Sequence, residues 1–166
     1  VADGTSEAPI TFTALNPEAS SADQVDSDSS SADGKSALGT RGKWGGLILL
    51  GKAPTSAAMT ATVEGIVGKT YGGTDPSDSS GVLRYVRVWH GGAIVGADNE
   101  INGITFAGVG SGTVVDHCEV AYNADDGFEF FGGTVNVKYL SALFVKDDAF
   151  DTDLGYQGKG QFLFVM

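Results

Sequence analysis

A duplication at a spacing of 22 residues constrains the fold of this chain more than any other feature. The block DDGFEFFGG at 125–133 recurs as DDAFDTDLG at 147–155, and HCEVAYNADD at 117–126 aligns with YLSALFVKDD at 139–148 at the same offset. A related block, NGITFAG, precedes them at 102–108. A self-similar period in the low twenties, with short strands and glycine turns, is typical of a solenoid.

Apolar and polar side chains alternate inside each unit, which is the pattern of strands with one buried face. No helical period of useful length competes with this alternation. A 22-residue unit without a helix cannot form an ordinary crossover connection, but its strands can coil so that each turn stacks about 4.8 Å from the next. The positions on the inward parity are Cys118, Val120 and Tyr122, with Leu140, Ala142 and Phe144 one unit later.

The sequence therefore predicts an all-β chain that folds as a right-handed parallel β-helix, whose hand follows from the general chirality of parallel connections. A β-sandwich with one duplicated hairpin is the alternative, but it does not explain why acidic dipeptides recur at equivalent positions. The prediction requires Phe128 to lie over Phe150 of the next unit and to align with Ile104 of the preceding one.

The N-terminal quarter of the chain has a different composition. Residues 9–15 alternate as a first strand, whereas residues 16–40 are rich in Ser and Asp and hold almost no large apolar side chain. Such a segment is a long solvated loop. We therefore divide the chain into 1–42, an N-terminal strand or cap with the Ser/Asp-rich loop, and 43–166, the β-helix coils, which form one domain with the N-terminal strand.

Between residues 43 and 100 the repeat is less regular. Residues 43–53 align with the later NGITFAG block, residues 61–67 form another short strand, and residues 70–80 are a loop by every turn signal. The segment 82–90 is a strand, and 91–100 is an excursion that breaks the spacing. On that strand we expect Val86, Val88 and His90 to face inward, and Tyr85, Arg87 and Trp89 to face outward.

The charge of the chain excludes some partners. The net charge is −11, and the only arginines are Arg41, Arg84 and Arg87. Nucleic-acid phosphates and anionic membranes require basic patches, so neither is an expected partner. No apolar run approaches the length that spans a bilayer. The single cysteine, Cys118, falls on the core parity, so we expect no disulfide framework.

The two ends of the sequence suggest a compartment and a partner. The chain starts Val1-Ala2-Asp3 without a methionine, which we interpret as a mature exported protein whose signal peptide has been removed. The expected location is extracellular or on the outer cell surface. Residues 162–165, FLFV, predict a strand with an exposed apolar edge, so either the chain continues or another copy covers it by self-association through the coil ends.

The acidic blocks are the strongest candidate for chemistry. Stacked coils place carboxylates directly over one another, and such a ladder needs a cation, raised pKa values or water to relieve the repulsion. Hard oxygen ligands in excess suit calcium, the one cofactor that the sequence suggests. Asp residues that cap turns through backbone N–H groups are the alternative. The candidate calcium ligands are Asp125, Asp126, Glu129, Asp147, Asp148, Asp151 and Asp153.

Catalysis is a second alternative for the same residues. A glycosidase needs two carboxyl groups at a set separation, which adjacent or alternate coils provide. In that interpretation Asp126, Asp147 and Asp148 are the catalytic candidates for an enzyme acting on polysaccharide. Any stacked acidic turn meets this geometry, however, and nothing in the spacing is diagnostic.

A column of aromatic residues is the third candidate. Tyr85, His117 and Tyr139 occupy equivalent outward positions in successive units, with Trp89 nearby. Aromatic rings of this kind bind sugars in a carbohydrate-binding module. The alternative is a cross-strand packing ladder without a ligand.

From about residue 41 onward the chain resembles a widespread group of uncharacterised bacterial surface and secreted proteins. They are often described as lipoproteins or sorting-domain proteins and are common in marine and Bacteroidetes-type bacteria. The motifs that carry the resemblance are KWGGLILLGKAP at 43–54, SSGVLRYVRVWHGG at 79–92, NEINGITFAGVGSGT at 99–113, NADDGFEFFGGTVNVKYL at 123–140 and DDAFDTDLGYQGKGQF at 147–162. The resemblance implies a right-handed parallel β-helix and export to the envelope or beyond, and it implies no established activity.

Together these observations predict an exported structural or adhesive β-helix of the cell surface or extracellular matrix, which self-assembles end to end into filaments. The alternatives are a polysaccharide-degrading glycosidase or lyase and a non-catalytic carbohydrate-binding module.

Overall fold

The computed structural model describes residues 1–15, 41–57, 62–63, 66, 68–96 and 99–166, and within these ranges all regular structure is β-strand. The predicted Ser/Asp-rich loop at 16–40 lies outside the described residues, as does most of the predicted strand at 61–67. The strands are β1 (Ala2–Asp3), β2 (Ile10–Phe12), β3 (Leu47–Leu50), β4 (Val82–Arg84), β5 (Val86–Trp89), β6 (Ile94–Gly96), β7 (Asn99–Glu100), β8 (Ile104–Ala107), β9 (Val114–Ala121), β10 (Phe128–Phe131), β11 (Asn136–Leu143), β12 (Phe150–Asp153) and β13 (Gly160–Val165).

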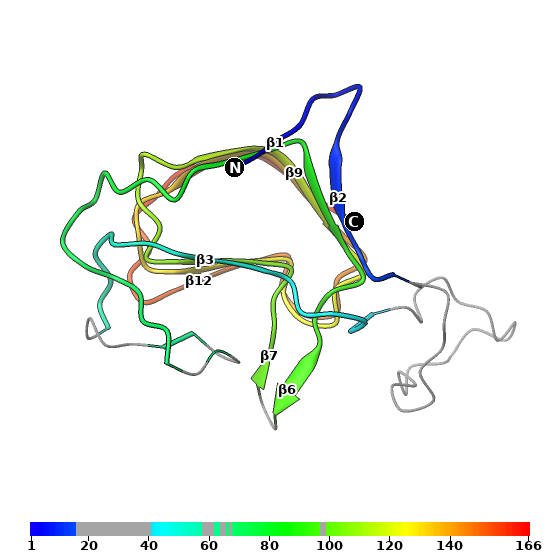
Figure 1. Cartoon of the computed structure of the whole chain (residues 1–166), viewed down its shortest axis with the longest axis horizontal. Coiled ribbons are helices and arrows are strands. Elements are labelled where there is room, and N and C mark those ends of the chain that lie inside the picture. Colours follow the sequence, from blue (N-terminus) through cyan, green and yellow to red (C-terminus); the bar gives the residue numbers. More distant parts are fainter. Residues whose placement is uncertain (16–40, 58–61, 64–65, 67, 97–98) are drawn as a thin grey trace, which may run out of the picture.

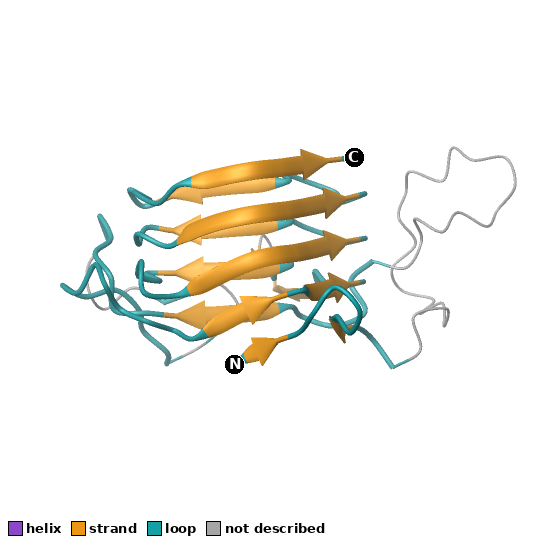
Figure 2. Ribbon diagram, turned by 90° about the horizontal axis from the view of Figure 1, so that it is seen from above, coloured by secondary structure: helices purple, strands orange, loops and turns teal. Residues whose placement is uncertain are grey.

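The strands form two parallel sheets on opposite sides of one coil. Sheet A contains β1, β2, β4, β5, β9, β11 and β13, and sheet B has the order β12-β10-β8-β3. From β8 onward the chain alternates between the sheets, one strand in B and the next in A, and each pass adds a coil to the stack (Figure 2). The chain therefore folds as a right-handed parallel β-helix, which confirms the prediction from the repeat.

The register of the coils agrees with the sequence alignment. Phe128 pairs with Phe150 on one side and with Ile104 on the other. One position along, Glu129 pairs with Asp151 and with Thr105. A parallel ladder fixes every later position once one pair is fixed, so the acidic blocks lie directly over one another.

The interior of the coil is a continuous apolar core. Phe106 and Phe128 are fully buried, and each stacks on the phenylalanine of the next coil, with ring centroids 5.0 Å apart for Phe106–Phe130 and 5.2 Å for Phe128–Phe150. The inward positions of sheet A complete this core: Leu83, Val86, Val88, Val115, Cys118, Val120, Val137, Leu140 and Ala142.

Four successive coils of sheet A, from β4–β5 to β13, bend at an aromatic residue in the left-handed backbone region. The bend residues are Tyr85, His117, Tyr139 and Phe162, with φ of 49°, 51°, 54° and 60°. The left-handed region costs an L-residue roughly 1–2 kcal/mol, and ring stacking between coils offsets part of that cost. Because each bend splits sheet A into two sides, the cross-section of the helix has three sides (Figure 1).

A second set of left-handed residues corrects the prediction for the inward parity. His90, Tyr122 and Phe144 were expected to face the core, but they follow their strands at φ of 62°, 55° and 54°. His90 and Tyr122 are half-buried, Phe144 is exposed, and the three rings stack with centroids 5.4 Å and 5.3 Å apart. A left-handed residue turns the chain out of the pleat, so side-chain alternation does not continue through it.

Two features interrupt the regular coils. The predicted excursion at 91–100 is confirmed as the antiparallel pair β6–β7, which projects from the helix (Figure 1). The predicted loop at 70–80 contains no strand apart from a bridge between Thr62 and Thr70. Val63 and Tyr71, on either side of that bridge, pack against outer-face residues of sheet B: Ile48, Leu50, Ala107, Phe131 and Leu154.

Candidate functional site

The acidic corner of the helix lies where the chain turns from sheet A into sheet B. The turn between β9 and β10 is fixed by Asn123, which is fully buried and donates its Nδ2–H to the carbonyl of Asp126 at 2.8 Å. The Asp126 carboxylate in turn accepts the backbone N–H of Asp148, one coil further on, at 2.9 Å. Asp126 therefore links two successive turns.

The structure brings five of the seven predicted calcium ligands together in two overlapping groups. Asp125, Asp126 and Asp147 form one group, and Asp126, Glu129 and Asp151 form the other. In each group one oxygen from every side chain lies within 4.8 Å of the others. Asp126 belongs to both groups, so the local negative charge is densest there.

Turn capping, the alternative to metal binding, is also present. Asp151 and Asp153 accept the backbone N–H of the residue that follows each of them, at 2.7 Å and 2.6 Å. Asp148 takes part through its backbone N–H, which it donates to Asp126. The side chains of Asp148 and Asp153 are exposed and belong to neither of the two carboxylate groups. A carboxylate has two oxygens, so accepting one backbone N–H leaves the second oxygen available to another partner.

Two features of this corner differ from an exposed acidic ladder. Glu129 occupies the predicted column but is only 7% exposed. Burial raises the pKa of Asp126 to about 6; the Asp148 N–H opposes this, and the charges of Asp125, Asp151 and Asp147 add to it. The protein thus keeps carboxylates close together in a site that is partly removed from water.

Sequence reasoning missed Asn102, which lies beside this cluster. Its side chain is 4% exposed, its Nδ2 donates to Oε2 of Glu129, and its Oδ1 has no hydrogen-bond partner among the described residues. The sequence could have identified Asn102 through the alignment of NGITFAG with DGFEFFG. Since Ile104 pairs in register with Phe128, Asn102 corresponds to Asp126 of the next coil.

The predicted aromatic column forms a continuous stack across four coils. Ring centroids are 4.6 Å apart for Tyr85–His117, 4.4 Å for His117–Tyr139 and 4.7 Å for Tyr139–Phe162. The rings lie nearly parallel, so each inner ring turns its faces to its neighbours and only its edge outward. Sugar binding by these residues stays a prediction, and it would have to use ring edges and polar atoms.

Trp89 lies apart from that column, at the end of β5. Its indole Nε1–H donates to Glu119 at 2.8 Å, and the guanidinium carbon of Arg87 lies 5.7 Å from the centroid of its ring. These contacts hold the indole against its own sheet.

An open groove of about 590 Å³ crosses three coils of sheet A beside the aromatic stack. Asp116, Lys138 and Gln161 pair in register along it, and each directly precedes an aromatic bend residue. The groove contains none of the predicted catalytic residues Asp126, Asp147 and Asp148. Its lining is Thr113, Val114, Val115, Asp116, Thr134, Asn136, Val137, Lys138, Gln157, Lys159 and Gln161.

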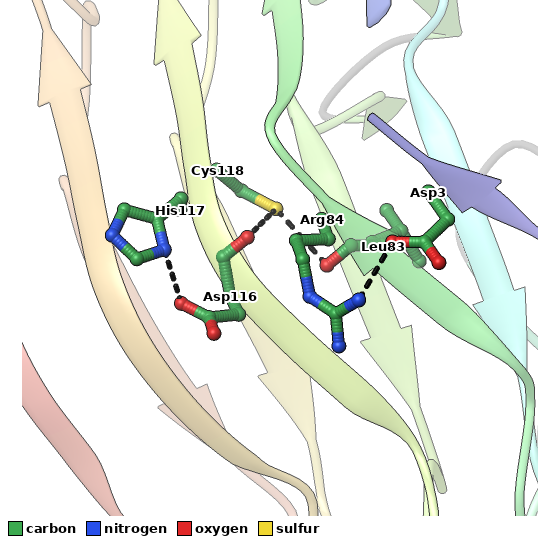
Figure 3. A network of polar contacts seen from close by, with 6 residues as sticks. All are labelled: Asp3, Leu83, Arg84, Asp116, His117 and Cys118. Carbon is green, nitrogen blue, oxygen red and sulfur yellow. Dashed lines mark hydrogen bonds and ion pairs between the residues drawn. The ribbon is translucent and has the colours of Figure 1, made fainter. Parts of the chain in front are cut away.

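Polar contacts order the sheet at one side of this groove (Figure 3). Arg84 forms an ion pair with Asp3 at 2.8 Å, and it pairs in register with Asp116, so charges of opposite sign alternate from Asp3 to Lys138. Nδ1 of His117 lies 2.5 Å from Oδ1 of Asp116. These contacts fix the base from which the groove side chains project.

Cys118 is a structural residue next to the same contacts. Its thiol lies 3.6 Å from the carbonyl oxygens of Leu83 and Asp116, and burial raises its pKa to about 11. A thiol with that pKa is not a nucleophile near neutral pH.

Comparison with known proteins defines the class to which this fold belongs. A family model described as a pectate-lyase-like β-helix domain matches residues 32–166. The chain therefore belongs to the pectate-lyase-like β-helix domain family. No curated protein and no solved structure shows a significant match to it. Among the described residues we find no helix that is long and apolar enough to cross a membrane.

Proposed function

We propose that this chain is an adhesive module: a non-catalytic β-helix that binds polysaccharide through the groove on sheet A. The proposal includes export to the bacterial cell surface or extracellular matrix, where such a ligand is met. The observation that carries it is the open groove of about 590 Å³, which is lined by residues from three successive coils.

The chemistry of the groove suits a glycan. The side chains of Asn136, Gln157 and Gln161 provide amide donors and acceptors, and Lys138 and Lys159 provide ammonium donors. Sugar hydroxyls are both donors and acceptors, so an amide-rich channel can satisfy them on both sides.

The position of the carboxylates favours binding over hydrolysis. A glycosidase requires two carboxyl groups on either side of one bond of the bound substrate. Asp116 is the one carboxylate in the groove lining, and the acidic corner lies where sheet A turns into sheet B. We therefore assign the groove a binding role and the acidic corner a separate one.

Affinity electrophoresis tests this proposal. Gels containing neutral or uronate-rich polysaccharides are expected to retard the wild-type chain, and the double variant K138A/Q161A is expected to bind at least about tenfold more weakly, since each lost hydrogen bond to a ligand is worth about 1 kcal/mol. The matched control is K146A, which removes an exposed lysine outside the groove. Retention of full retardation by the groove variant would overturn the proposal, as would the release of reducing ends by the wild type.

Self-association is the second candidate function, favoured by β13. This strand pairs with β11 along one edge and is exposed at all six positions. Its side chains form a contiguous apolar strip: Phe162, Leu163, Phe164, Val165 and Met166 are each 45–63% exposed. We propose that a strand from a second copy adds to this edge in parallel, which would extend the coil from one molecule to the next.

Sedimentation velocity measures this association. We expect the sedimentation coefficient of the wild type to rise with concentration, and that of F164D to remain at the monomer value, because a buried unpaired charge prevents the strand from pairing. I94D is the matched control, since Ile94 is also exposed (53%) but lies on the β6–β7 hairpin. Equal association of F164D and wild type would exclude β13 as the contact.

A further inference from the structure

The chain on either side of β3 reaches past the neighbouring coils of the helix. We name each coil by its strand in sheet B, where the order β12-β10-β8-β3 places two strands between β3 and β12. Units of a solenoid contact only their neighbours as a rule, so the coils of β3 and β12 are not expected to touch. Residues 51–56, which follow β3, and Arg41, which precedes it, nevertheless bond to the coil of β12.

Residues 51–56 cross the ends of three strands of sheet B. The four strands of this sheet end in register, at Leu50, Ala107, Phe131 and Asp153. Beyond that point the chain from β3 continues along the stack of coils. Three backbone hydrogen bonds of 2.8–2.9 Å mark its path, one to each coil: Ala53 N–H to the carbonyl of Gly108, Gly133 N–H to the carbonyl of Pro54, and Ser56 N–H to the carbonyl of Leu154.

The length of this segment agrees with the distance that it spans. Three coil spacings of about 4.8 Å amount to roughly 14 Å. The chain from Gly51 to Ser56 reaches at most about 18 Å when fully extended, so it spans the three coils only if it runs nearly straight along the helix axis. It also packs closely, since a Cβ on Gly132 would lie 2.7 Å from both Cβ and Cγ2 of Thr55.

Arg41 makes the second contact, at the other end of β12. Its guanidinium donates to the carbonyl of Phe144 through Nε at 3.2 Å and through Nη2 at 2.8 Å. The backbone next to it bonds to an earlier coil, because the N–H of Lys43 donates to the carbonyl of His90. His90, Tyr122 and Phe144 stack in that order on successive coils, so the arginine reaches two coils further than its own backbone. Hydrogen bonds from a charged donor are stronger than those between neutral groups.

We propose that residues 41–56 act as a clasp, which fastens the coil of β12 to the coil of β3. Phe144 precedes β12 and Leu154 follows it, so the clasp holds both ends of this edge strand. An edge coil with neighbour contacts alone opens by itself at low free energy, whereas the clasp makes β12 open together with β10 and β8. The clasp needs no ligand, although Gln157 and Lys159 of the groove follow Leu154 on the same coil and are restrained with it.

Native-state hydrogen exchange of single backbone amides measures this coupling in the whole chain. The N–H groups of Phe128 and Gly132 donate to carbonyls on the coil of β12, so they exchange when that coil opens. The N–H groups of Ile104 and Gly108 donate to carbonyls on the coil of β10, so they exchange only when β10 opens. After correction for intrinsic rates, we expect the two pairs of amides to exchange within about threefold of each other in the wild type.

The double variant R41Q/S56P removes both anchors, because it lacks the guanidinium that bonds to Phe144 and the N–H that bonds to Leu154. We expect Phe128 and Gly132 to exchange at least about tenfold faster than Ile104 and Gly108 in this variant. A uniform loss of stability would accelerate all four amides equally, so the ratio between the pairs separates release of the clasp from general destabilisation.

Three further variants complete the test. S56A keeps the backbone N–H of residue 56, and S6P places a proline at an exposed serine outside the clasp, so both are expected to exchange like the wild type. R41Q alone leaves the backbone unchanged and is expected to give a smaller difference, of about threefold or more, which tests the clasp if the double variant does not fold. Equal exchange of the two pairs in the double variant would overturn the proposal, as would equal exchange in R41Q where only that variant folds, or a tenfold difference already in the wild type.

Discussion

Replacement of Gly133 by alanine is expected to lower the free energy of unfolding by about 2–5 kcal/mol, the sum of two separate penalties. Gly133 has φ of +81°, a region that costs alanine roughly 1–2 kcal/mol. A Cβ at this position would lie 2.5 Å from the carbonyl oxygen and 2.8 Å from the backbone nitrogen of Val109, in the preceding coil. Relief of that overlap requires the coils to separate, and forced packing of this kind costs about 1–3 kcal/mol.

Gly68 provides the matched control for this prediction. Its φ of +76° is almost the same, but a Cβ there meets no atom of the described residues within 4 Å. G68A should therefore show only the backbone penalty of about 1–2 kcal/mol. Urea unfolding followed by circular dichroism measures both variants, with a chelator present to remove any contribution from metal. Equal losses in G133A and G68A would mean that the coils are not packed as closely as the structure shows.

Replacement of Phe128 by alanine is expected to lower the free energy of unfolding by about 3–5 kcal/mol. The ring is fully buried, and it lies between Ile104 of one coil and Phe150 of the next. Its loss leaves a cavity at the centre of the stack, and both neighbouring coils lose contact surface. The same urea titration measures the effect.

Phe164 gives the control for Phe128, because the substitution is chemically identical. Its side chain is 51% exposed, on β13, so F164A should cost less than about 1 kcal/mol. A small loss in F128A, comparable to that in F164A, would contradict the placement of Phe128 in the core.

The fold was predictable because one offset repeats without interruption. Between the units that contain Phe128 and Phe150 nothing is inserted, so the sequence alignment and the strand register coincide. The prediction that His90, Tyr122 and Phe144 face inward was wrong. It assigned alternate residues to the same face of the strand, which holds only while the pleat is unbroken. Each of these residues adopts a left-handed conformation, which composition and alternation do not reveal when the residue is aromatic and not glycine.

The candidate sites were predictable only in part. The column of Glu129 over Asp151 follows directly from the repeat, but the burial of Glu129 does not, since burial depends on packing outside the repeat. Asn102 was missed because its side chain is a neutral amide and the search of the repeat followed only acidic residues, although the alignment of Ile104 with Phe128 places it beside Asp126. The groove on sheet A was missed because Asn136, Gln157 and the other lining residues form no motif until three coils are stacked.

A crystal structure of the chain grown with calcium tests the central claim most directly, because the claim concerns the register of successive coils. The account predicts that Glu129 lies between Thr105 and Asp151, with the Phe128 and Phe150 rings stacked near the 5.2 Å centroid separation described above. Phe128 and Phe150 in separate, unpaired strands would contradict both the fold and the sites derived from it.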